Sequence, residues 1–254
     1  LKIQNSANFS VPGSGKTWMG YSTFFMMKDV ENIVDKLLVI GPKVAVRAWN
    51  IEYEAMTGKK PDIKNIKAPE GSSQEIFHNV DQHEIFFVNY SMLGRELDNI
   101  RTMLQQHRFL VIADESHHFK DESTLNAINI REIAQHCTRK MILPGTMMPK
   151  ELSDVYTQFD FLLTDSGVLP NFERFKEIYP NDNLEAQRTV SELLNPYFYR
   201  ISKQRLGLPP QTFNFTINPT TYSSTFTNPN DVVEMYDVQR RIYNVIAEMF
   251  ANPS

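Results

Sequence analysis

One stretch near the start of the chain, Ser10-Val11-Pro12-Gly13-Ser14-Gly15-Lys16-Thr17, constrains the fold and the chemistry more than any other. Glycines at this spacing let a backbone curl until several amide N–H groups point into one concavity, and a following helix adds partial positive charge there. The pattern is that of a phosphate-binding loop, G-x-x-x-x-G-K-[ST], with Ser10 in place of the first glycine. It predicts a strand before the loop and a helix after it.

The residues of this loop have distinct expected roles. The curled backbone from Pro12 to Gly15, with Gly13 and Ser14 between them, would surround the phosphates of a nucleotide. Lys16 would reach the β- and γ-phosphates, and the Thr17 hydroxyl would ligate Mg²⁺. A glycine-rich turn before an ordinary helix is the alternative, and it weakens if a distant strand ends in carboxylates that can hold the metal.

Such a strand is predicted at Phe109-Leu110-Val111-Ile112-Ala113, directly before Asp114-Glu115-Ser116-His117. An apolar run without alternation is typical of a strand buried on both faces of a parallel sheet. Because α/β sheets bind ligands at the carboxyl ends of their strands, Asp114 would hold Mg²⁺ and Glu115 would orient the attacking water. A helix N-cap is the other interpretation of Asp-Glu, and the phosphate-binding loop makes it the weaker one.

Apolar runs and helical patterns alternate along the first part of the chain, which predicts an α/β fold with a mostly parallel central sheet flanked by helices. Strands are expected over residues 3–9, 36–40, 63–66, 85–90, 109–113 and 140–144, and helices after residue 17 and over 43–53, 91–106 and 124–134. The helix after residue 17 is apolar around most of its circumference, so its aromatic residues, Trp18 included, are expected in the core. From residue 151 the pattern becomes helical, over 152–163, 172–178, 184–194 and 231–250, with one strand over 213–217. We therefore expect a nucleotide-binding core, 1–150, and a helical extension, 151–254.

Composition and charge exclude some classes of protein. A formal charge of −4 does not indicate nucleic-acid binding by the whole surface, so any such contact requires a local basic patch. The single cysteine, Cys137, excludes an internal disulfide framework, fits a reducing compartment such as the cytoplasm, and is expected to be a buried structural thiol. No apolar run reaches the length of a membrane span, so no membrane contact is expected.

Several stretches resemble, in order, the ATPase motor of superfamily 2 helicases and translocases, and the Swi/Snf-type branch most of all. The matching stretches are 10–17 (motif I), 39–52 (motif Ia), 87–91 (motif Ib), 114–117 (the DExH box), 143–146 (motif III), 199–211 and 239–243. Two departures fall in motif III, where Pro144 and Met147 replace a threonine and a proline of the family pattern. In the family this loop couples hydrolysis to movement, and Thr146 is retained in it.

The resemblance implies a RecA-like lobe that binds ATP and Mg²⁺, and it assigns residues to roles. It implies catalysis by Lys16, Asp114, Glu115 and His117, nucleic-acid contacts by Lys43, Arg47, Asn89 and Tyr90, and coupling by Gly145 and Thr146. For Lys43 and Arg47, one turn apart, a solvated helix face is an equally good interpretation of composition alone.

The function expected from this resemblance is an ATP-dependent double-stranded DNA translocase, of which this sequence is the first motor lobe. A strand-separating helicase acting on DNA or RNA is the first alternative, and a non-catalytic nucleotide-gated binding module is the second. The partners expected are double-stranded DNA and the family's second RecA-like lobe, which supplies arginine fingers worth about 10³–10⁵ in rate. The lobe alone is therefore expected to hydrolyse ATP poorly.

Overall fold

The computed structural model describes residues 5–11, 13–67, 73–145, 152–181 and 183–199, and the backbone of two further strands over 211–217 and 220–226. Some sequence-based expectations lie outside these residues. They are the roles of Pro12 and Thr146, the substitution at Met147, positions 200–210 of the motif at 199–211, the motif at 239–243 and the helix expected over 231–250.

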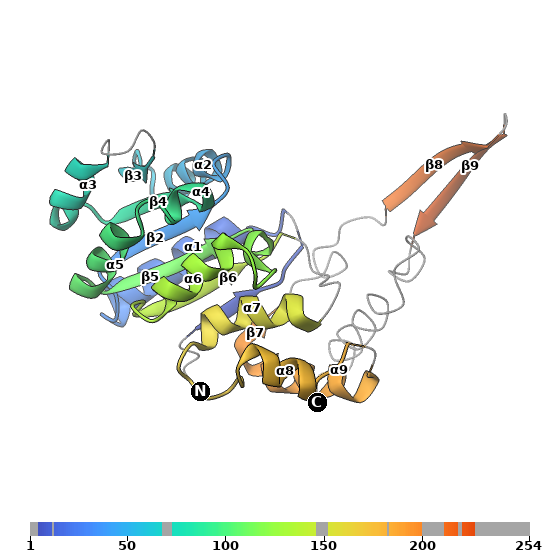
Figure 1. Cartoon of the computed structure of the whole chain (residues 1–254). Coiled ribbons are helices and arrows are strands. Elements are labelled where there is room, and N and C mark those ends of the chain that lie inside the picture. The colour runs from blue at the N-terminus through green and yellow to red at the C-terminus, as the bar shows by residue number, and fades with distance from the viewer. Residues whose placement is uncertain are drawn as a thin grey trace.

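A seven-stranded, wholly parallel sheet in the order β3-β4-β2-β5-β6-β1-β7 forms the centre of the molecule (Figure 1). Its strands are β1 (Ser6–Asn8), β2 (Lys36–Gly41), β3 (Ile63–Ile66), β4 (Ile85–Asn89), β5 (Phe109–Asp114), β6 (Arg139–Leu143) and β7 (Phe198–Tyr199). This confirms the predicted α/β class. The two remaining strands, β8 (Gln211–Ile217) and β9 (Thr220–Phe226), pair antiparallel as a hairpin.

The central strands β2, β4, β5 and β6 are buried on both faces, because each contributes to two apolar clusters. Alternate residues of β2 point to opposite faces, with Leu38 and Ile40 in one apolar cluster and Leu37 and Val39 in the other. Helices α1 (Lys16–Phe25) and α2 (Ala45–Thr57) cover the second face, where Tyr21, Phe24 and Trp49 pack against the strands. The apolar, non-alternating strand sequences therefore follow from burial on both faces.

The other face is covered by further helices (Figure 1). They are α4 (Tyr90–Leu93), α5 (Leu97–Gln106), α6 (Leu125–Ala134) and α7 (Leu152–Leu163), with α8 (Phe172–Ile178) and α9 (Leu184–Leu194) packed beside α7 and α3 (Gln74–His78) at the end of the sheet. Short non-α turns complete the helical segments: η1 (Met26–Val30), η2 (Val80–Gln82), η3 (Ser116–Phe119) and η4 (Asn195–Tyr197).

Two sequence-based expectations about these elements are wrong. The single helix expected over 91–106 is broken between α4 and α5 at Gly94, Arg95 and Glu96. Gly94 has a low helix propensity, and an added Cβ there would lie 2.6 Å from the Asn129 amide of α6. Trp18, expected in the core, has 42% of its surface exposed, because α1 buries only the stripe formed by Gly20, Tyr21 and Phe24.

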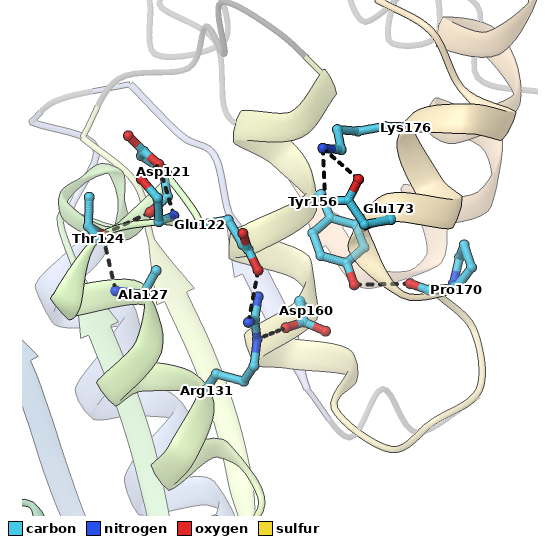
Figure 2. Close-up of polar contacts among 11 residues, drawn as sticks. Asp121, Glu122, Thr124, Ala127, Arg131, Tyr156, Asp160, Pro170, Glu173 and Lys176 are labelled. Carbon is cyan, nitrogen blue, oxygen red and sulfur yellow. Dashed lines mark hydrogen bonds and ion pairs between the residues drawn. The ribbon is translucent and has the colours of Figure 1, made fainter.

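The helical extension is joined to the sheet by polar and apolar contacts. Arg131 on α6 donates to Glu122 (3.1 Å) and to Asp160 on α7 (2.8 Å), as Figure 2 shows. Tyr156 on α7 donates to the Pro170 carbonyl at 3.0 Å (Figure 2). Apolar residues of α7 and α9 belong to the same cluster as those of β2 and β4, so the described part of the extension shares the core of the sheet.

The Cys137 thiol donates to the Ile133 carbonyl at 3.2 Å, and burial raises its pKa to about 12, which makes it a poor nucleophile at neutral pH.

Within the part of the chain that the structure describes, no helix is both long enough and apolar enough to cross a membrane.

Candidate nucleotide site and adjoining groove

Candidate residues from five strands gather at one edge because the sheet is wholly parallel. The phosphate-binding loop follows β1, Lys43 follows β2, Asn89 ends β4, Asp114 ends β5 and Gly145 follows β6. Register brings the strand ends level, with Ala113 opposite Ile40 and Asp114 opposite Leu143. The carboxyl edge is where α/β sheets bind ligands, so the fold itself builds the site that the motifs predict.

The loop takes the curled form that the sequence predicts. Gly13 (φ 77°) and Gly15 (φ 79°) are left-handed, a conformation that costs other residues about 1–2 kcal/mol. Ser10 is not among the described residues with positive φ, so this position does not require the glycine of the family pattern. Ser10 is buried, its N–H donates to Asn8 Oδ1 at 3.0 Å, and its carbonyl accepts from Lys16 Nζ at 3.0 Å.

Lys16 lies within the electrostatic reach of both acidic residues. Burial lowers the pKa of its ammonium, and the nearby carboxylates of Glu115 and Asp114 oppose that shift. The C-terminal end of β5, which carries these two carboxylates, therefore lies at the same edge of the sheet as the phosphate-binding loop. This ammonium donates to the Ser10 carbonyl and lies in the field of two carboxylates, and it can turn toward an incoming phosphate.

Asp114 is held by a residue that sequence analysis treated as core. The Trp49 indole N–H donates to Asp114 Oδ2 at 2.9 Å, and the ring is fully buried against Gly20 of α1. Burial raises the pKa of Asp114, and the Trp49 hydrogen bond works in the opposite direction by stabilising the carboxylate. Trp49 thus joins α2 to the carboxylate expected to hold the metal.

Glu115 sits in a tightly enclosed turn. Its φ of 52° is left-handed, its N–H donates to the Leu143 carbonyl at 2.8 Å, and His117 Nδ1 lies 3.2 Å from its Oε2. This contact is not a hydrogen bond, since His117 Nδ1 is buried without a hydrogen-bond partner. A Cβ on Gly145 would fall 1.6 Å from Glu115 Oε2, so the carboxylate lies directly on the Gly145 backbone.

These residues fit a magnesium-bound nucleoside triphosphate. The Ser14 hydroxyl is buried without a hydrogen-bond partner, and a Cβ on Gly13 would meet nothing within 4 Å, so the loop offers both a free donor and open space. Thr17 and Asp114 provide a hydroxyl and a carboxylate, which are oxygen ligands of the kind Mg²⁺ prefers alongside phosphate and water. No group of three or more potential metal-ligating side chains occurs among the described residues.

A groove of about 570 Å³ adjoins this site along the ends of β2, β3 and β4. The described residues that line it are Pro42, Lys43, Asn65, Lys67, Phe87, Asn89, Tyr90, Ser91, Met92, Arg95, His118 and Asn126. Three are cations and none is acidic, although the whole chain carries a formal charge of −4. This is the local basic patch that the composition requires for any contact with nucleic acid.

Three of the four residues predicted to contact nucleic acid line this groove. Lys43 and Asn89 line it, and the Asn89 side chain also caps α4 by accepting from the Met92 N–H at 3.1 Å. Tyr90 forms a wall, but it is only 5% exposed and its hydroxyl points inward. Arg47 is exposed on α2 and does not line the groove.

Four relevant residues were not predicted as site residues: Lys67, Arg95, His118 and, for the metal position, Trp49. Lys67 follows a short edge strand, and Arg95 lies in the helix break that sequence periodicity missed. For Trp49, the available signal was its place in motif Ia, and for His118 it was the position after the DExH box.

Comparison with known proteins gives a family for this arrangement. The SNF2-related domain matches residues 11–251, which is nearly the whole chain. The chain belongs to this family. Among its relatives, the SNF2-related chain is 27% identical to DNA repair and recombination protein RAD54B of Mus musculus over 147 residues, covering 58% of this chain and 16% of that protein. It is 22% identical over 196 residues to the ISWI chromatin-remodeling complex ATPase ISW2 of Saccharomyces cerevisiae, covering 74% of this chain and 17% of that protein.

Solved structures show the same fold. The Sulfolobus solfataricus SWI2/SNF2 ATPase core in complex with double-stranded DNA superposes with a TM-score of 0.63 at 21% identity, covering 80% of this chain and 41% of that one. The core domain from the same organism without DNA in its description gives the same TM-score at 19% identity. The SNF2-related chain thus spans less than half of these solved cores and less than a fifth of the two relatives named above.

Proposed function

We propose that this SNF2-related chain is the first motor lobe of an ATP-dependent double-stranded DNA translocase. One observation carries the proposal: an electrostatically coupled lysine and carboxylate pair lies at the same sheet edge as an acid-free groove lined by three cations. A motor that hydrolyses ATP while holding a nucleic-acid backbone requires at least a nucleotide site and an adjacent site for the phosphates of that backbone.

At the nucleotide site, Lys16 exchanges its Ser10 carbonyl for β- and γ-phosphate oxygens, a change that its partly buried ammonium favours. Thr17 and Asp114 hold Mg²⁺, which when bound neutralises charge on the transferred phosphoryl group. Glu115 orients a water for attack and accepts its proton, with its carboxylate fixed by the backbone of Gly145. His117, next to that carboxylate, restricts its position from the other side.

At the groove, Lys43, Lys67 and Arg95 neutralise backbone phosphates of one strand. Such contacts carry no sequence information and weaken steeply with salt, as a translocating enzyme requires. Asn65, Asn89 and Ser91 supply neutral polar groups around the same anions. Double-stranded DNA is the proposed substrate because the relatives named above are repair and chromatin-remodeling proteins, and one neighbour was solved on DNA.

The proposal is tested on the full-length protein with two displacement assays and an ATPase assay. We expect ATP hydrolysis that duplex DNA stimulates, displacement of a third strand from a triplex, and no unwinding of a forked duplex. Unwinding of the fork would instead support a strand-separating helicase. Lys16→Ala is expected to weaken ATP binding, whereas Glu115→Gln should bind ATP and fail to hydrolyse it. If Glu115→Gln retained every activity, a non-catalytic nucleotide-gated module would replace the motor.

Two further parts of the proposal concern the rest of the protein. A second RecA-like lobe would complete the ATP site, so residues 1–254 alone should hydrolyse ATP about 10³-fold or more slowly than the full-length protein. The protein would act where duplex DNA is found, in the cytoplasm at the nucleoid if it is bacterial.

A further inference from the structure

Tyr90 and His118 form the end wall of the groove and also contact the turn that carries Glu115. Their rings stack with centroids 5.2 Å apart and an interplanar angle of 29°. His118 is exposed to the groove, whereas Tyr90 is only 5% exposed. The stacked pair therefore lies between the groove, to which His118 is exposed, and the turn at Asp114 and Glu115.

Two separate contacts lead from this wall to Glu115. The Tyr90 hydroxyl donates to the Asp114 carbonyl at 2.7 Å, which fixes the peptide plane between Asp114 and Glu115. His118 stacks on His117, with centroids 4.7 Å apart, and His117 Nδ1 lies 3.2 Å from Glu115 Oε2. The backbone contact and the side-chain contact reach the same residue by different routes.

The turn at Glu115 has an unfavourable backbone conformation that its surroundings must hold in place. The left-handed φ of 52° is unfavourable for a residue with a side chain, by about 1–2 kcal/mol relative to ordinary backbone. Four hydrogen bonds stabilise it: the Glu115 N–H donates to the Leu143 carbonyl and to Asp114 Oδ1, the His118 N–H donates to the Glu115 carbonyl, and the Tyr90 hydroxyl donates to the Asp114 carbonyl. Only the last comes from a side chain that lines the groove.

We propose that Tyr90 and His118 are positioning residues that convert occupation of the groove by a nucleic-acid backbone into alignment of Glu115. This inference rests on the proposed function. A phosphate bound beside His118 restrains the His118 ring against Tyr90 and His117. The restrained wall holds the Asp114 carbonyl and the Glu115 carboxylate, so the left-handed turn is populated more fully with DNA bound than without it.

The test compares Tyr90→Phe with a matched control in the full-length protein. Tyr90→Phe removes only the hydroxyl and keeps the stacked ring. Tyr156→Phe removes a similar hydroxyl, from a tyrosine that is 4% exposed and donates to a backbone carbonyl in the α7–α8 region. We expect Tyr90→Phe to lower the ratio of DNA-stimulated to basal ATPase rates about tenfold, and the Kd for duplex DNA to change less than about twofold. Tyr156→Phe should leave both unchanged.

A second variant and a spectroscopic readout guard against a trivial result. His118→Ala, at an exposed position, tests the other route and should also lower the stimulation ratio. In residues 1–254 carrying Trp18→Phe, Trp49 is the only tryptophan, and its bond to Asp114 makes its emission a reporter of the turn. Duplex DNA should change that emission in this variant and change it far less when Tyr90→Phe is added.

Either of two outcomes overturns the inference: a wild-type stimulation ratio in both Tyr90→Phe and His118→Ala, or a loss of stimulation fully explained by weaker DNA binding. Failure of the proposed function is recognisable separately, because the unsubstituted protein would then show no DNA-stimulated hydrolysis at all.

Discussion

The Glu115 carboxylate lies against the Gly145 backbone, and this contact leads to a prediction at the scale of one residue. In Gly145→Ala the new Cβ would lie 1.6 Å from Glu115 Oε2, so the carboxylate must move away. Because Glu115 is the proposed base, we expect kcat for DNA-stimulated ATP hydrolysis to fall about 10²-fold while ATP affinity changes little. Steady-state kinetics and a nucleotide-binding titration measure the two quantities.

The control for that variant is Gly58→Ala, at the end of α2. Gly58 has φ +68° and nothing within 4 Å of an added Cβ, so alanine there costs stability without meeting any side chain. We expect a lower melting temperature and a normal kcat. An equal loss of kcat in both variants would mean that Gly145 matters only for stability.

Trp49 gives a second prediction at this scale, on pH dependence. Burial raises the pKa of Asp114, and the indole N–H lowers it by stabilising the carboxylate. Trp49→Phe removes the donor, so the pKa should rise further, and the ionised form that holds Mg²⁺ should be lost at a higher pH. We expect the acidic limb of the kcat/KM profile to move to higher pH. Trp18→Phe, which alters an exposed ring, should leave the limb where it is.

A site residue could be predicted from the sequence where a short local motif specifies its position. Lys16, Asp114 and Glu115 could be placed because a short motif and the end of an apolar strand specify them, and a parallel sheet brings such ends together. Arg95 and His118 could not, because they enter the groove only through a helix break and a stacking contact. The roles assigned to Lys43, Arg47, Asn89 and Tyr90 stay predictions, although Arg47 lies outside the groove lining.

At the scale of elements, the strongest agreement is in the helical extension. Helices α7, α8 and α9 begin and end at the residues that periodicity indicates, and in α8 and α9 an asparagine N-cap marks the start. Disagreement occurs where tertiary contacts decide. The first strand, expected over 3–9, is described only at Ser6–Asn8, and β7 is two residues long and leaves no periodic signal.

Arg131 provides a prediction for how those elements are held together. It joins Glu122 to Asp160 of α7 and its side chain is 36% exposed, so the network is only partly screened by solvent (Figure 2). We expect Arg131→Gln to lower the free energy of unfolding by about 1 kcal/mol. Arg174→Gln breaks a more exposed pair within α8, and should cost about 0.3 kcal/mol or less. Urea unfolding of residues 1–254 measures both, and equal costs would show that Arg131 does not join the two parts.

At the scale of the whole molecule, the net charge and the groove make opposite contributions to DNA binding. A chain with a formal charge of −4 should be repelled by DNA except where Lys43, Lys67 and Arg95 converge. Each phosphate contact contributes about 0.9 to the slope of log Kd against log salt concentration, so the double variant Lys43→Ala/Arg95→Ala should lower that slope by about 2. The double variant Lys59→Ala/Lys60→Ala removes the same charge from exposed positions just beyond the C-terminal end of α2 and should lower it by less than about 0.5. Anisotropy titrations of a labelled duplex at several salt concentrations measure the slopes, and equal reductions would show that overall charge, and not the groove, determines binding.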